Sequence, residues 1–209
     1  MKRVHAIAAI ALLLGLSSCL STIHPIFTEK DLLFDQRLIG SWKYEAKPSG
    51  GTVQIIKATK QDLDHLPALQ KLAGKVYLAS YRDGAGDIEA VYFGFFLKLG
   101  NNYYMDFYPA ETPATKNYDD FYRGHYLKMH TAYRIRFNNS NSFEMKQLDE
   151  TYLKNLIRDK KIRISHETTE DGSFVVTAPT QELQQYLLKY GDTPEAYYSE
   201  NTSTYTKIQ

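Results

Sequence analysis

Few side chains in this sequence have both the type and the spacing that chemistry requires. Cys19 is the only cysteine, so it is the only thiol that could act as a nucleophile or carry a covalent group. Ser165-His166-Glu167 has the residue types of a hydrolase triad, but neighbouring side chains on a strand point to opposite faces. His130 could hold a metal ion with Asp119 or Asp120, yet no metal-binding motif such as His-Glu-x-x-His occurs. The sequence therefore predicts no catalytic residue, metal site or cofactor, and we do not expect an enzyme.

The segment before Cys19 has the pattern of an export signal. Lys2 and Arg3 form a short positive region, and residues 6–16 are an apolar run of eleven. A helix that spans a bilayer needs about 20 residues, so this run is too short to be a membrane anchor. A charged start, a short apolar run and small residues are typical of a segment that is removed after export. We predict that residues 1–18 are a signal peptide.

The tetrapeptide Leu16-Ser17-Ser18-Cys19 resembles the lipobox of bacterial lipoproteins. The resemblance implies that the Cys19 thiol takes a diacylglyceryl group, that cleavage makes Cys19 the first residue, and that its amine is then acylated, for example with palmitate. Several acyl chains make a stable anchor where one would be marginal. Leu20 and Ser21 follow without an acidic residue, which implies an outer-membrane location facing the periplasm if the cell has two membranes. The alternative is an ordinary signal peptide without lipidation.

The composition excludes some classes of partner. The chain has 25 Lys and Arg against 24 Asp and Glu, and nucleic-acid-binding proteins need a basic excess. With one cysteine no intramolecular disulfide can form, so the fold depends on its core alone. The chain is rich in aromatic residues, with 17 Tyr and 10 Phe, which favour strands and fill large cores or pockets. We therefore expect no nucleic-acid partner. We expect the chain to associate with the membrane only through Cys19.

The hydrophobic pattern predicts one β-rich domain over residues 39–209, with residues 19–38 as lipid anchor and connector. Apolar residues alternate with polar ones over many short segments separated by turn residues. Three helices are expected. The first covers residues 61–73, where Pro67 demands a kink or a break. The second is a short helix after Asp149, and the third covers residues 180–190 with Thr180 as its cap. The expected strands are 42–46, 52–57, 75–81, 88–97, 102–108, 126–137, 143–148, 161–168, 173–177 and 203–208.

Gly40-Ser41-Trp42 on the first expected strand resembles the Gly-x-Trp that opens lipocalins, and the helix at 180–190 is similar to the lipocalin helix outside the barrel. The strand and helix pattern predicts a mostly β, antiparallel barrel of about 8–10 strands with two or three short helices. The resemblance implies that this barrel is lipocalin-like and that Trp42 plugs its base. Closure removes exposed sheet edges, which are an aggregation hazard. The alternatives are a strongly curved sheet or an α+β arrangement. The sequence departs from lipocalins in lacking a mid-chain Thr-Asp-Tyr turn.

Aromatic residues between 92 and 108 are the candidate binding site. A barrel interior lined by them would suit a small apolar ligand. The alternative is a filled core without a cavity, because side chains alone can fill a small barrel. The candidate ligand-binding residues are Tyr92, Phe96, Tyr104 and Tyr133.

The segment Pro109–His125 is a long stretch without periodicity and a second candidate surface. Two functions follow from the sequence. The first is a membrane-anchored envelope lipoprotein that binds a small apolar ligand without catalysis. The second is an envelope scaffold or protein-interaction lipoprotein that uses this segment as its contact surface.

Overall fold

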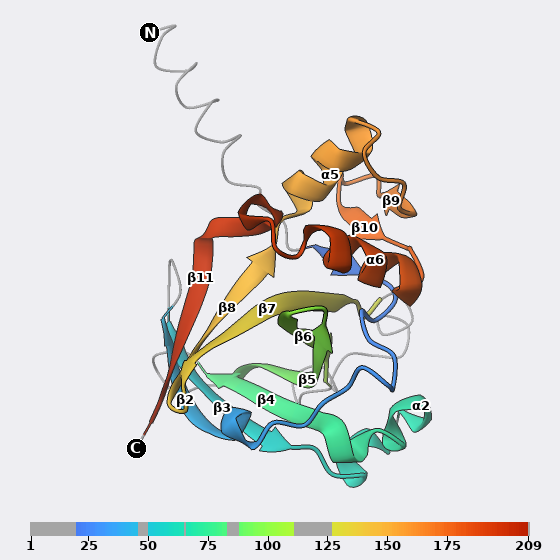
Figure 1. The fold of residues 1–209 in the computed structure, drawn as a ribbon. Coiled ribbons are helices and arrows are strands. Elements are labelled where there is room, and N and C mark those ends of the chain that lie inside the picture. Colours follow the sequence, from blue (N-terminus) through green and yellow to red (C-terminus); the bar gives the residue numbers. More distant parts are fainter. Residues whose placement is uncertain (1–19, 46–49, 65, 83–87, 111–126, 209) are drawn as a thin grey trace, which may run out of the picture.

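A computed structural model describes residues 20–45, 50–64, 66–82, 88–110 and 127–208 of the chain. Its centre is a closed antiparallel barrel of eight strands, which lies below α5 (Glu150–Arg158) and α6 (Thr180–Tyr190) in Figure 1. Consecutive strands pair around the ring, and β6–β7 and β2–β11 pairings complete it, which confirms the predicted closed barrel. The barrel strands are β2 (Gly40–Glu45), β3 (Gly51–Lys57), β4 (Val76–Arg82), β5 (Ile88–Leu99), β6 (Asn102–Pro109), β7 (His130–Asn139), β8 (Ser142–Leu148) and β11 (Tyr197–Lys207).

The alternation of side chains along each strand separates two cores. On β6, Met105 and Phe107 point into the barrel, and Tyr104 lies on its outer wall. The outer wall is covered by the N-terminal segment and the C-terminal helix, so both faces of β5 are buried, as its doubly apolar sequence indicates. The buried interior residues are Leu38, Trp42, Val53, Ile55, Tyr77, Ala79, Phe96, Met105, Phe107, Ile135, Phe143, Met145 and Tyr205.

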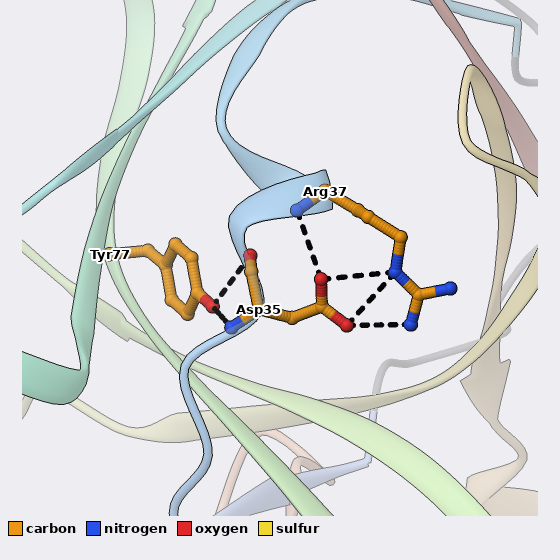
Figure 2. A network of polar contacts seen from close by, with 3 residues as sticks. All are labelled: Asp35, Arg37 and Tyr77. Atoms are coloured by element: carbon orange, nitrogen blue, oxygen red, sulfur yellow. Dashed lines mark hydrogen bonds and ion pairs between the residues drawn. The ribbon is translucent and has the colours of Figure 1, made fainter.

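The base of the barrel is closed by the short 3-10 helix η1 (Gln36–Leu38). The indole nitrogen of Trp42 donates a hydrogen bond to the Leu38 carbonyl at 3.0 Å, which fixes η1 below the strands. Asp35 caps η1 and forms an ion pair with Arg37, while the Tyr77 hydroxyl accepts from the Asp35 amide at 2.6 Å and donates to its carbonyl at 3.1 Å (Figure 2). Trp42 is therefore part of the plug at the base, where the resemblance to lipocalins placed it.

The N-terminal segment lies on the barrel from the first residue that the structure describes. Leu20 is buried, and β1 (Ser21–Thr22) pairs antiparallel with the start of β7. The chain then crosses the outer wall, where Phe27 stacks on Phe95 with ring centroids 4.4 Å apart, and reaches the base at Asp35. We call residues 20–35 the strap. It joins the end of the barrel where β1 pairs with β7 to the plugged base.

The elements between β8 and β11 form a lobe that lies above the barrel in Figure 1. β1 also pairs in parallel with β10, which pairs with β9. No helix in the described parts of the chain is both long enough and apolar enough to span a membrane. The lobe contains α5 (Glu150–Arg158), β9 (His166–Thr168), β10 (Phe174–Val176), α6 (Thr180–Tyr190) and η4 (Pro194–Ala196).

Several boundaries differ from the predicted ones. The helix expected over 61–73 is broken into η2 (Gln61–Leu63), α2 (Pro67–Gln70) and η3 (Ala73–Lys75), because Pro67 can start a helix but not continue one. The strand expected from 161 begins only at His166. Thr180 does not cap α6: Pro179 holds the cap position, and the Thr180 hydroxyl donates to the Pro25 carbonyl of the strap at 2.8 Å.

Candidate functional site

The barrel is packed in its lower half and hollow in its upper half. Trp42 and Phe143 fill the base, with ring centroids 4.7 Å apart. Above them lies an open cavity of about 470 Å³, within the range of small-molecule sites. The interior is therefore partly a filled core and partly a pocket. The cavity is lined by Ser21, Tyr44, Tyr81, Ala90, Tyr92, Phe107, Pro109, Leu127, Met129, Thr131, Tyr133, Met145, Ser203 and Tyr205.

The four predicted ligand-binding residues do not lie together. Tyr92 and Tyr133 line the cavity from β5 and β7. Phe96 points into the barrel but belongs to the packed half, where it stacks on Tyr103. Tyr104 does not line the cavity. It alternates with the inward-pointing residues of β6 and therefore lies in the outer core. Its hydroxyl contacts that of Tyr197 at 3.3 Å, on the opposite side of the barrel wall from the cavity.

Sequence reasoning missed three further tyrosines of the cavity wall. Tyr44, Tyr81 and Tyr205 come from β2, β4 and β11. β3 lies between β2 and β4, while β2 meets β11, far along the chain, only when the barrel closes. Tyr44 stacks on Tyr205 with centroids 5.8 Å apart and meets Tyr81 edge to face at 5.5 Å. Tyr44 could have been predicted to point inward, because it alternates with the charged residues Lys43 and Glu45 and shares a face of the strand with Trp42.

The cavity wall is aromatic and uncharged. None of the described residues that line it carries a formal charge at neutral pH. The hydroxyls of Tyr81 and Tyr205 lie 3.3 Å apart. Burial raises the pKa of both phenols well above the ordinary value, so both stay neutral throughout the physiological range. Such a wall can hold apolar surface against its rings and supply hydroxyl groups to a neutral polar atom, but it offers no counter-charge to a buried ion.

A buried ionisable pair lies on the outer wall rather than in the cavity. His130 Nδ1 is 2.8 Å from Asp106 Oδ1, and the Ile26 amide of the strap donates to Asp106 Oδ2 at 2.9 Å. Burial raises the pKa of Asp106, and the hydrogen bond from His130 opposes this rise. The pair holds the strap against β6 and β7. His130, a candidate metal ligand in the sequence, has its Nδ1 occupied by Asp106 in this arrangement.

The other candidate residues from the sequence form no catalytic or metal site among the described residues. No group of three or more His, Cys, Asp or Glu side chains in the described residues could hold a metal ion. Ser165 and Glu167 flank His166, whose Nδ1 lies 2.9 Å from the Ile164 carbonyl oxygen, a contact within its own chain segment. Cys19, Asp119 and Asp120 lie outside the described residues, as does the segment Pro109–His125 after its first two positions.

The fold and the cavity define a class of protein. A closed eight-stranded antiparallel barrel with a plugged base and a cavity at its other end is compatible with a lipocalin-like barrel. No protein-family model matches the chain, and comparisons with curated proteins and with solved structures give no match.

Proposed function

We propose that this chain is a membrane-anchored envelope lipoprotein whose barrel binds a small, uncharged, apolar ligand without catalysis. The observation that carries the proposal is the aromatic cavity of about 470 Å³ in the upper half of the barrel. A core that needed only stability would be filled, as the lower half is, because empty volume forfeits packing energy. A retained cavity with an open mouth is the usual sign of a binding site.

The anchoring part of the proposal depends on the N-terminal sequence. The positive start, the short apolar run and Leu16-Ser17-Ser18-Cys19 together support export and lipidation at Cys19. Lipidation would place the barrel at a membrane surface in the cell envelope. Labelling cells with a fatty-acid analogue tests this directly. A Cys19→Ala chain should lose the label, and unchanged incorporation would contradict lipidation.

Ligand binding can be tested on a chain that begins at Leu20 and is therefore soluble. Nile red is an uncharged apolar dye whose fluorescence rises in apolar sites, and it should bind the barrel with one-to-one stoichiometry. Ala90 lines the cavity with a methyl group, so a larger side chain at this position would project into the cavity. Ala90→Phe should place a ring inside the cavity and weaken dye binding, with the circular dichroism spectrum unchanged. Equal dye binding by the two chains would show that the cavity is not the binding site.

A further inference from the structure

The lipid-bearing residue and the fold are separated by almost no chain. Leu20 is buried with 3% of its surface exposed, and the next two residues pair with β7 and β10. The Ile23 amide then donates to the Val176 carbonyl at 2.9 Å. A tether that reaches away from a membrane needs a flexible linker between its anchor and its domain. This chain has no such linker, because the residue after Cys19 is already part of the core.

This arrangement fixes which part of the barrel lies nearest the anchor. Ser21 belongs to the wall of the cavity, and it follows Cys19 by two positions. Two residues span at most about 7 Å, so the attachment point cannot be farther than that from the Ser21 backbone. Leu127, another lining residue, has 61% of its surface exposed. The end of the barrel that carries the anchor is therefore the end where the cavity opens.

The opposite end of the barrel is blocked by residues that the structure describes. The Trp42 indole and the Phe143 ring fill the base, and η1 is held across it by the Trp42 and Tyr77 hydrogen bonds. Several lining residues lie toward the other ends of their strands, among them Tyr44 near the end of β2 and Pro109 at the end of β6. Among the described residues, the cavity is open to a ligand through the mouth beside Ser21.

We propose that the cavity is loaded from the bilayer, and that its ligand is a lipid amphiphile that inserts one acyl chain while its head group stays at the mouth. This proposal depends on the proposed function and names its ligand. A short tether holds the mouth at the membrane surface, where single-chain lipids are concentrated. The wall carries no charged residue among those described, so a charged head group would remain outside, and the cavity volume suits one chain rather than a whole two-chain lipid.

The orientation can be measured on the lipidated protein in vesicles of phosphatidylethanolamine and phosphatidylglycerol. Because lipidation blocks the only native thiol, Leu127→Cys and Ile208→Cys each create a single labelling site. Leu127 lies at the mouth, and Ile208 lies at the base, where its amide donates to the Ser41 carbonyl. A fluorophore at 127 should be quenched by nitroxide-labelled phospholipid and one at 208 should not. Equal quenching at both positions would overturn the proposal.

Loading can be measured with dansyl-labelled lysophosphatidylethanolamine in the same vesicles. Trp42, the only tryptophan, lies at the base of the barrel, so energy transfer from it to the dansyl group reports occupancy. Inserting a Gly-Ser linker of about ten residues between Cys19 and Leu20 frees the mouth from the surface and should slow loading by roughly fivefold or more. The same linker appended after Gln209 is the matched control and should leave the rate unchanged.

The two proposals fail in different ways in this experiment. If the soluble chain binds Nile red but the linker between Cys19 and Leu20 leaves the rate of lipid loading unchanged, loading from the bilayer is wrong and the binding function stands. If the soluble chain does not bind Nile red and neither vesicle-bound chain loads the dansyl lipid, the binding function is wrong and this inference falls with it.

Discussion

Ser21 pairs with Thr131 where β1 meets β7, and both residues line the mouth of the barrel cavity. The strap is therefore part of the cavity wall as well as a cover for the outer core. β1 is only two residues long, so its own ladder contributes few hydrogen bonds. The strap depends instead on buried contacts farther along, among them the Ile26 amide on Asp106 and the Phe27 ring on Phe95. Contacts that dock the strap should consequently affect ligand binding as well as stability.

The first prediction separates the inside of the barrel from its outside with a matched pair of tyrosines. Tyr133→Leu removes a ring from the cavity wall and should weaken Nile red binding about three- to tenfold. Tyr104→Leu removes a fully buried ring and its contact with Tyr197, which should cost roughly 2–3 kcal/mol of unfolding free energy. Dye titration and urea unfolding measure the two effects. Weaker dye binding by the folded Tyr104→Leu chain would contradict the placement of that residue.

The second prediction concerns the pair that docks the strap. Asp106→Ala leaves the His130 ring and the Ile26 amide without their buried partner, and should lower the free energy of unfolding by about 2–4 kcal/mol. Nile red affinity should fall as well, because a loosened strap displaces Ser21. Urea denaturation and dye titration provide the measurements.

The control for Asp106 is an exposed ion pair. Lys43 and Glu45 lie 3.4 Å apart with 66% and 76% of their side chains exposed. Glu45→Gln should change stability by less than about 0.5 kcal/mol, as exposed pairs usually do. If Asp106→Ala costs no more than Glu45→Gln, the buried pair does not dock the strap.

Much of the barrel follows from local pattern. Each hairpin is specified by its own alternation and turn residues. The hairpin of β5 and β6, with Gly100 at a φ of 58° in its turn, could therefore be predicted from a short segment of sequence. The strap was not, because β1 has only two residues and its partners lie more than a hundred positions away. The start of β11 at Tyr197 was missed for a similar reason, since the polar run 199–203 shows no alternation and the register shifts between Tyr197 and Thr202.

The candidate site was only half predictable. Alternation identifies which residues of a strand share a face, but it does not say which face turns inward when both are apolar, and this is why Tyr104 was grouped with Tyr92. Nor does it give the height of a residue along the barrel. Phe96 and Tyr92 share an inward face, yet one lies in the packed half and the other in the hollow half. Only the closed arrangement of all eight strands decides that.

The third prediction is a change in alkaline stability at Tyr77. Burial raises the pKa of Tyr77 to about 12 from an ordinary value of 10.0. The folded chain therefore keeps a proton that the unfolded chain loses near pH 10, so stability falls as the pH rises from about 10 through 12. Tyr77→Phe should make this fall less steep, by at most about 1.4 kcal/mol per pH unit.

At neutral pH the same substitution has a different effect. Tyr77→Phe leaves the Asp35 amide without its acceptor and should cost roughly 1–2 kcal/mol. Urea unfolding at a series of pH values measures both effects on one variant. Because Tyr81 and Tyr205 also have raised pKa values, some alkaline loss should persist. Identical slopes for the two chains would mean that Tyr77 ionises equally easily in the folded and unfolded states.

The fourth prediction tests the glycine beside the base plug. Gly40 has a φ of 141°, a conformation that residues with a Cβ rarely adopt, and an added Cβ would lie 2.9 Å from Lys207 Cε. Lys207 in turn lies over the Trp42 ring, with its Nζ 5.2 Å from the centroid. Gly40→Ala should therefore lower the unfolding free energy by about 1–3 kcal/mol through backbone strain and displacement of Lys207.

Two further variants separate these causes. Gly74 has nothing within 4 Å of an added Cβ, so Gly74→Ala should leave the protein as stable or slightly more stable. Gly40→Ala can also be made in a chain that carries Lys207→Ala. If backbone strain causes most of the loss of stability, Gly40→Ala should still be destabilising there. If the lost cation–π contact causes most of it, Gly40→Ala should be nearly neutral. Because Gly40 begins the strand that carries Trp42, the first outcome would mean that glycine is required to lead the chain from η1 into the barrel wall.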